Sequence, residues 1–221
     1  MLKLSGIRKS FSDGANRINE VLRGVDLSVQ SGEFVAITGV SGSGKSTLLN
    51  ILGTLTEPDG GSYFLGNENM LTAGVDRSAL RNRDIGFLFQ QHRLLPQLTA
   101  LGNVLLPTLA NAKKPDKEQI EYAEELMKLT GVEGVAAQYP ATLSGGEAHR
   151  VALCRALIMK PKILLADEPT GQLDLETSAQ IAALLAATNC ELATTIVMVT
   201  HSEEMARFAD KIYAIREGVL E

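Results

Sequence analysis

The sequence predicts an α/β protein built on a mainly parallel β-sheet, with a helical subdomain inserted into it. Three continuous apolar runs, at 34–37, 163–166 and 195–199, suit central parallel strands that are covered on both faces. A glycine-rich loop at 39–47 joins the first of these runs to an apolar helical pattern. Residues 99–160 carry helical periodicity and interrupt the α/β pattern.

The first half of the chain supplies the other expected strands. Short alternating runs at 2–4 and 25–29 predict two of them, and a turn at 31–33 leads into the strand at 34–37. Residues 57–65 contain a turn that enters another strand. A buried strand is then expected at Ile85–Gln90, which ends in a polar residue.

The second half begins with the helical block. An amphipathic helix is expected from Glu118 to Thr130 and ends at Gly131, after a polar loop at 111–116. A further helix runs from Ser144 to about residue 159, before the chain returns to strands.

Composition argues against a nucleic-acid-binding, a membrane-spanning or a secreted protein. The chain has 221 residues, 45% of them hydrophobic and 21% charged, and a net charge of −5, so no basic surface indicates a nucleic-acid partner. No run approaches the ~20 apolar residues of a transmembrane helix, and the N-terminus lacks a signal-peptide pattern. The cysteines, Cys154 and Cys190, are expected to be buried free thiols, with a disulfide between them left open.

The loop at 39–47 has the spacing of a phosphate-binding loop. Its glycines allow a tight turn with inward N–H groups, and the following helix adds its positive N-terminal end. Lys45 can reach the β- and γ-phosphates, and the Ser46 hydroxyl can ligate Mg²⁺. The alternative, a Gly/Ser-rich turn with a chance lysine, does not explain the flanking strand and helix. The loop consists of Gly39, Val40, Ser41, Gly42, Ser43, Gly44, Lys45, Ser46 and Thr47.

Polar residues end the predicted parallel strands, at the edge where such sheets bind ligands. Asp167 is placed to hold Mg²⁺, directly or through water, and Glu168 can act as a general base on water. Gln90 can ligate Mg²⁺ or water, and His201 lies at the same edge. The alternatives are a surface turn with two solvated acids and a structural histidine.

The segment Ser144-Gly145-Gly146-Glu147 opens the last helix of the helical block. Ser144 and Glu147 have the spacing of a capping box, which is the purely structural interpretation. Two glycines in a first helical turn cost roughly 1 kcal/mol each against alanine. They let a ligand approach the backbone, and an exposed helix N-terminus can bind an anion.

Taken in chain order, these motifs resemble the nucleotide-binding subunits of ABC transporters, over nearly the whole chain. On that pattern, residues 39–47 are the Walker A loop, and Gln90 is the glutamine of the Q-loop. Residues Ser144, Gly145 and Gly146 carry the ABC signature.

The same resemblance assigns the remaining residues. Asp167 and Glu168 match the Walker B acids, with Glu168, His201 and Lys45 as the catalytic set. Residues 171–174 match the D-loop, and His201 matches the switch histidine. Phe11 matches the aromatic residue that stacks on adenine.

Finer matches resemble one branch, the lipoprotein-releasing and macrolide-export ATPases (LolD and MacB) with the cell-division relative FtsE. The segments that carry this likeness are 49–53, 81–87 and 89–96, followed by 98–101. Glu147 stands where the wider family often has Gln, as is common in the lipoprotein-releasing branch.

The resemblance implies the ABC ATPase fold, with a P-loop NTPase core, an antiparallel β subdomain and an inserted helical subdomain. The chain is then a single domain, with the α/β core and β subdomain in 1–90 and 161–221 and the helical signature subdomain in 91–160. It implies ATP hydrolysis with ATP and Mg²⁺ as cofactors. Ser46, Gln90 and Asp167 are the expected metal-binding residues.

The resemblance also implies partners. Two copies would form a head-to-tail dimer, with each ATP between 39–47 of one chain and 144–146 of the other. A separate membrane permease would dock on the helical subdomain and on Gln91–Pro107, where His92 to Pro96 are expected in an exposed loop. The chain would then be cytoplasmic and peripheral on the inner face of the cell membrane. The alternatives are a non-transport ABC-type ATPase, a nucleotide-sensing module without transport, and a small P-loop kinase.

Overall fold

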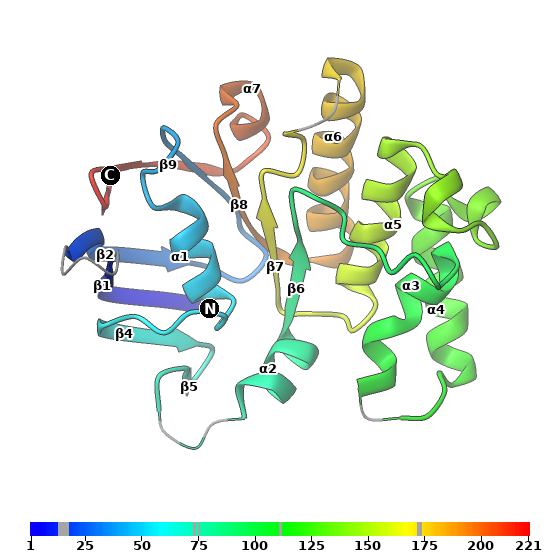
Figure 1. Ribbon diagram of the computed structural model, residues 1–221, viewed down its shortest axis with the longest axis horizontal. Coiled ribbons are helices and arrows are strands. Elements are labelled where there is room, and N and C mark those ends of the chain that lie inside the picture. Colours follow the sequence, from blue (N-terminus) through cyan, green and yellow to red (C-terminus); the bar gives the residue numbers. More distant parts are fainter. Residues whose placement is uncertain (13–17, 73, 75, 111, 172–173) are drawn as a thin grey trace.

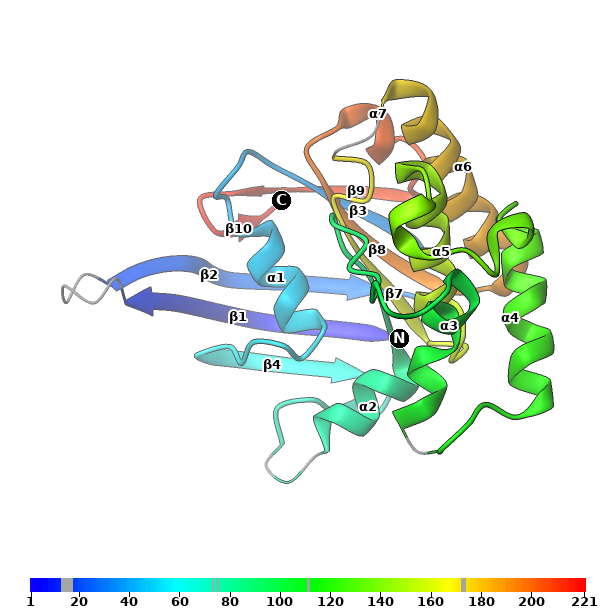
Figure 2. The same cartoon turned by 45° about the vertical axis from the view of Figure 1, so that its right-hand side comes forward.

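The computed structural model describes the chain except for residues 13–17, 73, 75, 111 and 172–173. Two β-sheets lie at one side of the molecule and a group of helices at the other, as Figures 1 and 2 both show. The predicted α/β class is confirmed. In the described part of the chain, no helix combines the length and apolar character needed to cross a bilayer.

The larger sheet has six strands in the order β10-β9-β3-β8-β7-β6. Its strands are parallel except for β10, which pairs antiparallel with β9. The three apolar runs of the sequence form β3, β7 and β8 at its centre, as predicted. In this spatial order the bounds are Val219–Leu220, Lys211–Arg216, Phe34–Thr38, Thr195–Thr200, Ile163–Asp167 and Ile85–Leu88.

The central strands bury both of their faces because successive side chains point to opposite sides of the sheet. In β3, Val35 and Ile37 pack in one hydrophobic cluster with helix α1 (Lys45–Leu52) and the smaller sheet. Phe34 and Ala36 pack in a second cluster with the helices on the opposite face. The sheet therefore separates two cores, and its carboxyl edge lies between them.

The smaller sheet is antiparallel, in the order β2-β1-β4-β5. Its first two strands are longer than predicted, because Gly6 and Gly24 do not end them. Both glycines have positive φ, and the pairing register shifts close to each, as in β-bulges. In spatial order the strands are Ile18–Val29, Leu2–Ser12, Gly60–Leu65 and Glu68–Asn69.

The helical block agrees with its prediction in both long helices. Helix α4 (Lys117–Leu129) starts at a capping box formed by Asp116 and Gln119, and α5 (Gly145–Leu157) starts at the predicted box. The helix before β6 was not predicted; Asp76 caps it. The other helices are α2 (Arg77–Asp84), α3 (Ala100–Leu105), α6 (Leu175–Leu192) and α7 (Glu203–Ala206), with 3₁₀ turns η1 (Leu106–Ala110), η2 (Glu133–Val135) and η3 (Pro140–Thr142).

The two cysteines lie in different environments. Cys154 is buried in α5, and its Sγ lies 3.1 Å from Thr130 Oγ1. Burial raises the pKa of the Cys154 thiol to about 12. Cys190 is exposed, so the prediction of burial is wrong for it, and both thiols are free.

A buried carboxylate links α2 to the edge of the larger sheet. Asp84, only 4% exposed, accepts from Arg83 at 2.6 Å and pairs with Lys162 at 3.3 Å. Burial raises the pKa of Asp84, but the hydrogen bond from Arg83 and the charge of Lys162 more than offset it, and the pKa is lowered overall.

Asp84→Asn is expected to lower the free energy of unfolding at pH 7 by about 2 kcal/mol, less than for a fully buried pair because both cations are partly exposed. Because the folded-state pKa is depressed, the contribution is present above the unfolded pKa of about 3.9 and is lost as pH falls through the folded value. Urea unfolding at pH 7 and below pH 4 measures both effects. Glu68→Gln, which affects an exposed pair, is the control, and equal stability of parent and Asp84→Asn at pH 7 would contradict this role.

Candidate nucleotide site

The loop between β3 and α1 needs its glycines for space as well as for conformation. Gly44 has φ +106, and a Cβ there would lie 2.9 Å from Leu22 Cδ2. A Cβ on Gly39 would lie 2.6 Å from the Ile215 carbonyl oxygen. Lys45, 5% exposed, donates to Gly39 O at 2.7 Å and to a second loop carbonyl, so its ammonium group lies inside the loop.

This loop fits an anionic ligand. Ser43 Oγ is buried and has no hydrogen-bond partner among the described residues, and the first N–H groups of α1 have no side-chain cap. An adjacent pocket of about 290 Å³ combines the loop with an aromatic and an acidic side chain. It is lined by Phe11, Val21, Ser41, Gly42, Gly44, Lys45, Ser46, Thr47 and Glu168.

A hydroxyl and a carboxylate from different elements meet beside the loop. Ser46 Oγ in α1 donates to Asp167 Oδ1 at the end of β7, at 3.2 Å. Burial raises the pKa of Asp167, the Ser46 hydrogen bond opposes this effect, and the neighbouring Glu168 charge adds to it. Two oxygen donors of this kind fit Mg²⁺, which binds few protein oxygens and keeps several waters.

Glu168 and His201 lie together at the carboxyl edge of the sheet. His201 Nδ1 is 3.1 Å from Glu168 Oε2. Glu168 has φ +43, an uncommon conformation for a residue other than glycine, and its N–H donates to Val199 O in β8. The turn after β7 therefore directs this carboxylate both to the phosphate-loop pocket and to the histidine.

Gln90 approaches the same acid from the loop after β6. A Cβ on Gly171 would lie 2.9 Å from Gln90 Nε2 and 3.4 Å from Glu168 Oε2, so both side chains face Gly171. Within the predicted D-loop at 171–174, residues 172 and 173 lie outside the described part of the chain.

Phe11 lies at the end of β1 on the same pocket, and the residue is 47% exposed. Asp59 fixes this strand end, because it accepts from Lys9 at 2.7 Å and from the Ser10 N–H at 2.6 Å. The Lys9 ammonium lies 5.3 Å from the centroid of the Phe11 ring. The strand end therefore presents a partly exposed aromatic face.

The signature residues line a different pocket. Ser144 caps α5, and its N–H and hydroxyl both donate to Glu147 Oε2 at 2.7 Å, which confirms the capping box. These hydrogen bonds lower the pKa of Glu147. The described lining of that pocket contains no phosphate-loop residue; it consists of Ser144, Gly145, Gly146, Glu147, Arg150, Asp174 and Thr177.

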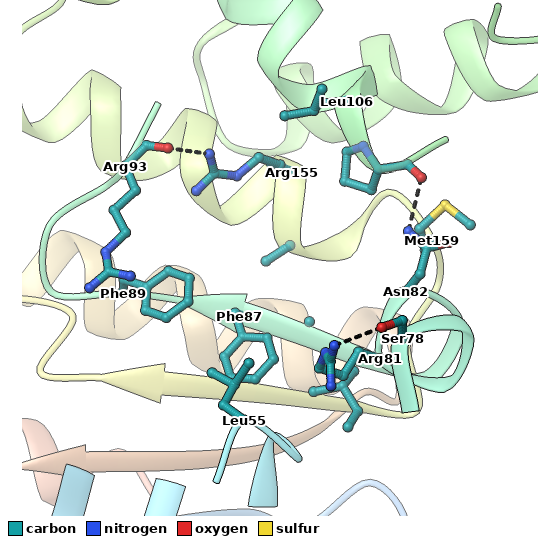
Figure 3. Close-up of a pocket in the computed structure, with 14 residues that line it drawn as sticks. Leu55, Ser78, Arg81, Asn82, Phe87, Phe89, Arg93, Leu106, Arg155 and Met159 are labelled. Carbon is teal, nitrogen blue, oxygen red and sulfur yellow. Dashed lines mark hydrogen bonds between the residues drawn. The ribbon is translucent and has the colours of Figure 1, made fainter. Parts of the chain in front are cut away.

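A third pocket, of about 440 Å³, opens between α2, β6 and the helical block (Figure 3). Asn82 Nδ2 donates to Pro107 O at 2.9 Å and so joins two of its walls. The lining combines apolar side chains with three arginines, and none of its described residues is acidic. These arginines are Arg81, Arg93 and Arg155.

The segment after Gln90 is only partly exposed. Leu95 is 42% exposed, but Leu94 is 8% exposed and packs in the helical core, so the expected exposure of Leu94 is wrong. Asn103 accepts from the Leu95 N–H and donates to Leu95 O, and these bonds fix the segment against α3.

Two side chains of α5 make contacts with the loop at 90–93 that were not predicted. His149 Nε2 lies 3.2 Å from Gln90 O, and Arg155 donates to the carbonyls of His92 and Arg93 at 2.7 Å. The signal in the sequence was a histidine and an arginine in a mostly apolar helix pattern; His149 is buried and Arg155 is half-buried, and such groups need partners.

A phosphate-binding loop, a hydroxyl–carboxylate pair and a strained glutamate beside a histidine together define a P-loop nucleotide hydrolase. Residues 22–171 match the family described as ABC transporter. The chain belongs to this family, as an ATP-binding and ATP-hydrolysing subunit.

Two curated relatives are similar over the whole chain. The chain is 45% identical to the lipoprotein-releasing system ATP-binding protein LolD 1 of Rhodopirellula baltica, over 100% of this chain and 96% of that protein. It is 43% identical to the macrolide export ATP-binding/permease protein MacB of the same organism, over 100% of this chain but only 32% of that protein.

A solved structure agrees with the fold. The ATP-binding cassette MJ0796, a dimer in a post-hydrolysis state with ADP and Pi, gives a TM-score of 0.89 at 40% identity. The alignment covers 100% of this chain and 97% of that one. The ABC ATPase fold expected from the sequence is confirmed.

Proposed function

We propose that two copies of this chain form an ATP-dependent dimer that drives a separate membrane permease, in lipoprotein release or export. The relatives named for those two activities support this proposal. The chain would then be peripheral to the membrane, on its cytoplasmic face.

We infer the following residue roles, which the contacts at the site support. Lys45 and the loop amides would hold the phosphates, and Phe11 would stack on the adenine. Ser46 and Asp167 would hold Mg²⁺, with Gln90 completing the metal and water ligands. Bound Mg²⁺ would neutralise phosphate charge.

The chemical step needs a base beside the γ-phosphate. Glu168 would take a proton from the attacking water. His201 would hold the Glu168 carboxylate, 3.1 Å away, and contact the phosphate.

The main support for the dimer is that the phosphate-loop pocket and the signature pocket are separate within one chain. Lys45, Ser46 and Glu168 line one, whereas Ser144 and Gly145 line another. A signature helix that contacts the γ-phosphate would therefore come from a second copy, and the dimeric cassette at 40% identity supports this arrangement.

Mixing two inactive variants tests this arrangement. Ser144→Arg and Lys45→Ala are each expected to be inactive alone, but their heterodimer contains one complete site. An equal mixture should regain measurable ATP turnover, up to about a quarter of the parental rate, since half of the dimers are mixed and each has one complete site of two.

The matched control pairs Lys45→Ala with Glu168→Gln. Both residues line the same pocket, so this mixture contains no complete site and should remain inactive. Recovery in both mixtures, or in neither, would contradict a site shared between two chains.

We also propose that residues 91–160 act as one unit and that the pocket in Figure 3 receives the permease. Apolar lining with arginines and no acid among the described residues favours an apolar segment that carries an acidic side chain. Leu55, which is 48% exposed on this pocket, offers a test position.

In membranes that contain the transporter, Leu55→Cys is expected to crosslink to the permease. Ile212→Cys is the matched control: Ile212 is equally apolar and 52% exposed, but it lies on β9, towards the opposite edge of the sheet. Equal crosslinking at both positions, or crosslinking at Ile212 alone, would contradict docking at this pocket.

A further inference from the structure

His149 lies buried between the signature turn and the loop that carries Gln90. The residue is 4% exposed. Its Nδ1 lies 3.2 Å from the Gly145 carbonyl oxygen, one turn back in α5, and its Nε2 lies 3.2 Å from the Gln90 carbonyl oxygen. One ring therefore contacts two of the predicted nucleotide-site motifs.

The two contacts of the His149 ring differ in how much depends on each of them. Both partners are carbonyl oxygens, which only accept hydrogen bonds, and a neutral imidazole has one N–H to donate. The Gly145 carbonyl lies in the first turn of α5, where the backbone N–H four residues later can also donate to it. The contact with Gln90 joins separate elements, so its loss would free the loop from the helix at this point.

A second side chain of α5 holds the same loop. Arg155 donates to His92 O and to Arg93 O, each at 2.7 Å, and Figure 3 shows the contact with Arg93. The His92 ring meets the His149 ring edge-on at 6.2 Å. The loop at 90–93 is thus attached to α5 at both of its ends.

We propose that His149 is a positioning residue that couples the two nucleotide sites of the dimer. The proposal rests on the dimer described above. Gln90 serves the site of its own chain, whereas Gly145 faces the nucleotide held by the partner. A movement of the Gln90 loop at one site is transmitted through the His149 ring to the signature turn of the other.

Three substitutions separate this role from packing. His149→Gln places an N–H donor near the Nε2 position and can keep the bond to Gln90 O. His149→Asn places its amide near the Nδ1 position and loses that bond, and His149→Phe fills the space without a donor. Thermal unfolding of each variant reports whether it folds.

The measurement is ATP turnover against ATP concentration. The parent is expected to have a Hill coefficient above one, with two as the limit set by two sites. The coefficient should stay near the parental value in His149→Gln and fall towards one in His149→Asn and His149→Phe. A second measurement uses the Glu168→Gln background. There, the ATP concentration for half-maximal dimer formation should rise about fivefold in the Asn variant, which is the effect expected from the loss of one hydrogen bond.

The outcomes are distinct. Parental cooperativity in the Asn and Phe variants, or its loss in the folded Gln variant, would overturn the role of His149 while the dimer stands. A parent chain without ATP-dependent dimers and with a Hill coefficient of one would overturn the proposed dimer, and the coupling with it.

Discussion

Glu168→Gln is expected to bind ATP and to hydrolyse it about 10²–10⁴-fold more slowly than the parent, the range for loss of a general base. The amide keeps the size of the carboxylate but cannot accept a proton from water. The turn that holds Glu168 at φ +43 depends on backbone hydrogen bonds, so the substitution should leave it in place. ATP-bound dimers should accumulate because hydrolysis no longer separates them.

Phosphate release measures the rate, and light scattering measures the dimer. The matched control is Glu204→Gln, which makes the same change in a side chain that lines the adjoining pocket with His201. Turnover of Glu168→Gln within a factor of about two of the parent would place the base elsewhere.

Lys45→Ala is expected to weaken ATP binding by about 10²-fold or more, because the substitution removes the charge-assisted hydrogen bonds that a single ammonium group donates. The Lys45 ammonium is buried, and the loop carbonyls that it contacts only accept hydrogen bonds. Without it, the loop retains its amides but loses the cation nearest to the β- and γ-phosphates.

Calorimetric titration with ATP and Mg²⁺ checks this expectation. Lys211→Ala removes a cation from the exposed end of β9, where it pairs with Glu33, and should bind ATP as the parent does. ATP affinity in Lys45→Ala equal to that of the Lys211 control would contradict the role of Lys45.

The central sheet could be predicted because its strands are buried on both faces. Continuous apolar runs such as 195–199 carry that information locally. The lengths of β1 and β2 could not be predicted in the same way. The predicted strands at 2–4 and 25–29 stop short of Gly6 and Gly24, but the pairing of β1 with β2 continues past both glycines through shifts of register.

The candidate site also has a part that the sequence predicts and a part that it does not. The phosphate loop and the acids after β7 are consecutive residues with fixed spacing, so the sequence predicts their position. The burial of Leu94 and the hydrogen bonds of Arg155 depend on how α5 packs against the loop after β6. Such contacts join residues about sixty positions apart, and local patterns do not report them.

The buried thiol of α5 has a practical consequence for labelling. Maleimides and disulfide reagents react with the thiolate, and burial both raises the pKa of the Cys154 thiol and shields its sulfur from the reagent, so Cys154 should resist them. Cys190, which is exposed, is the native thiol that such reagents reach. The single change Cys190→Ser should therefore give a background in which introduced cysteines can be modified selectively, without disturbing the helix that carries the signature.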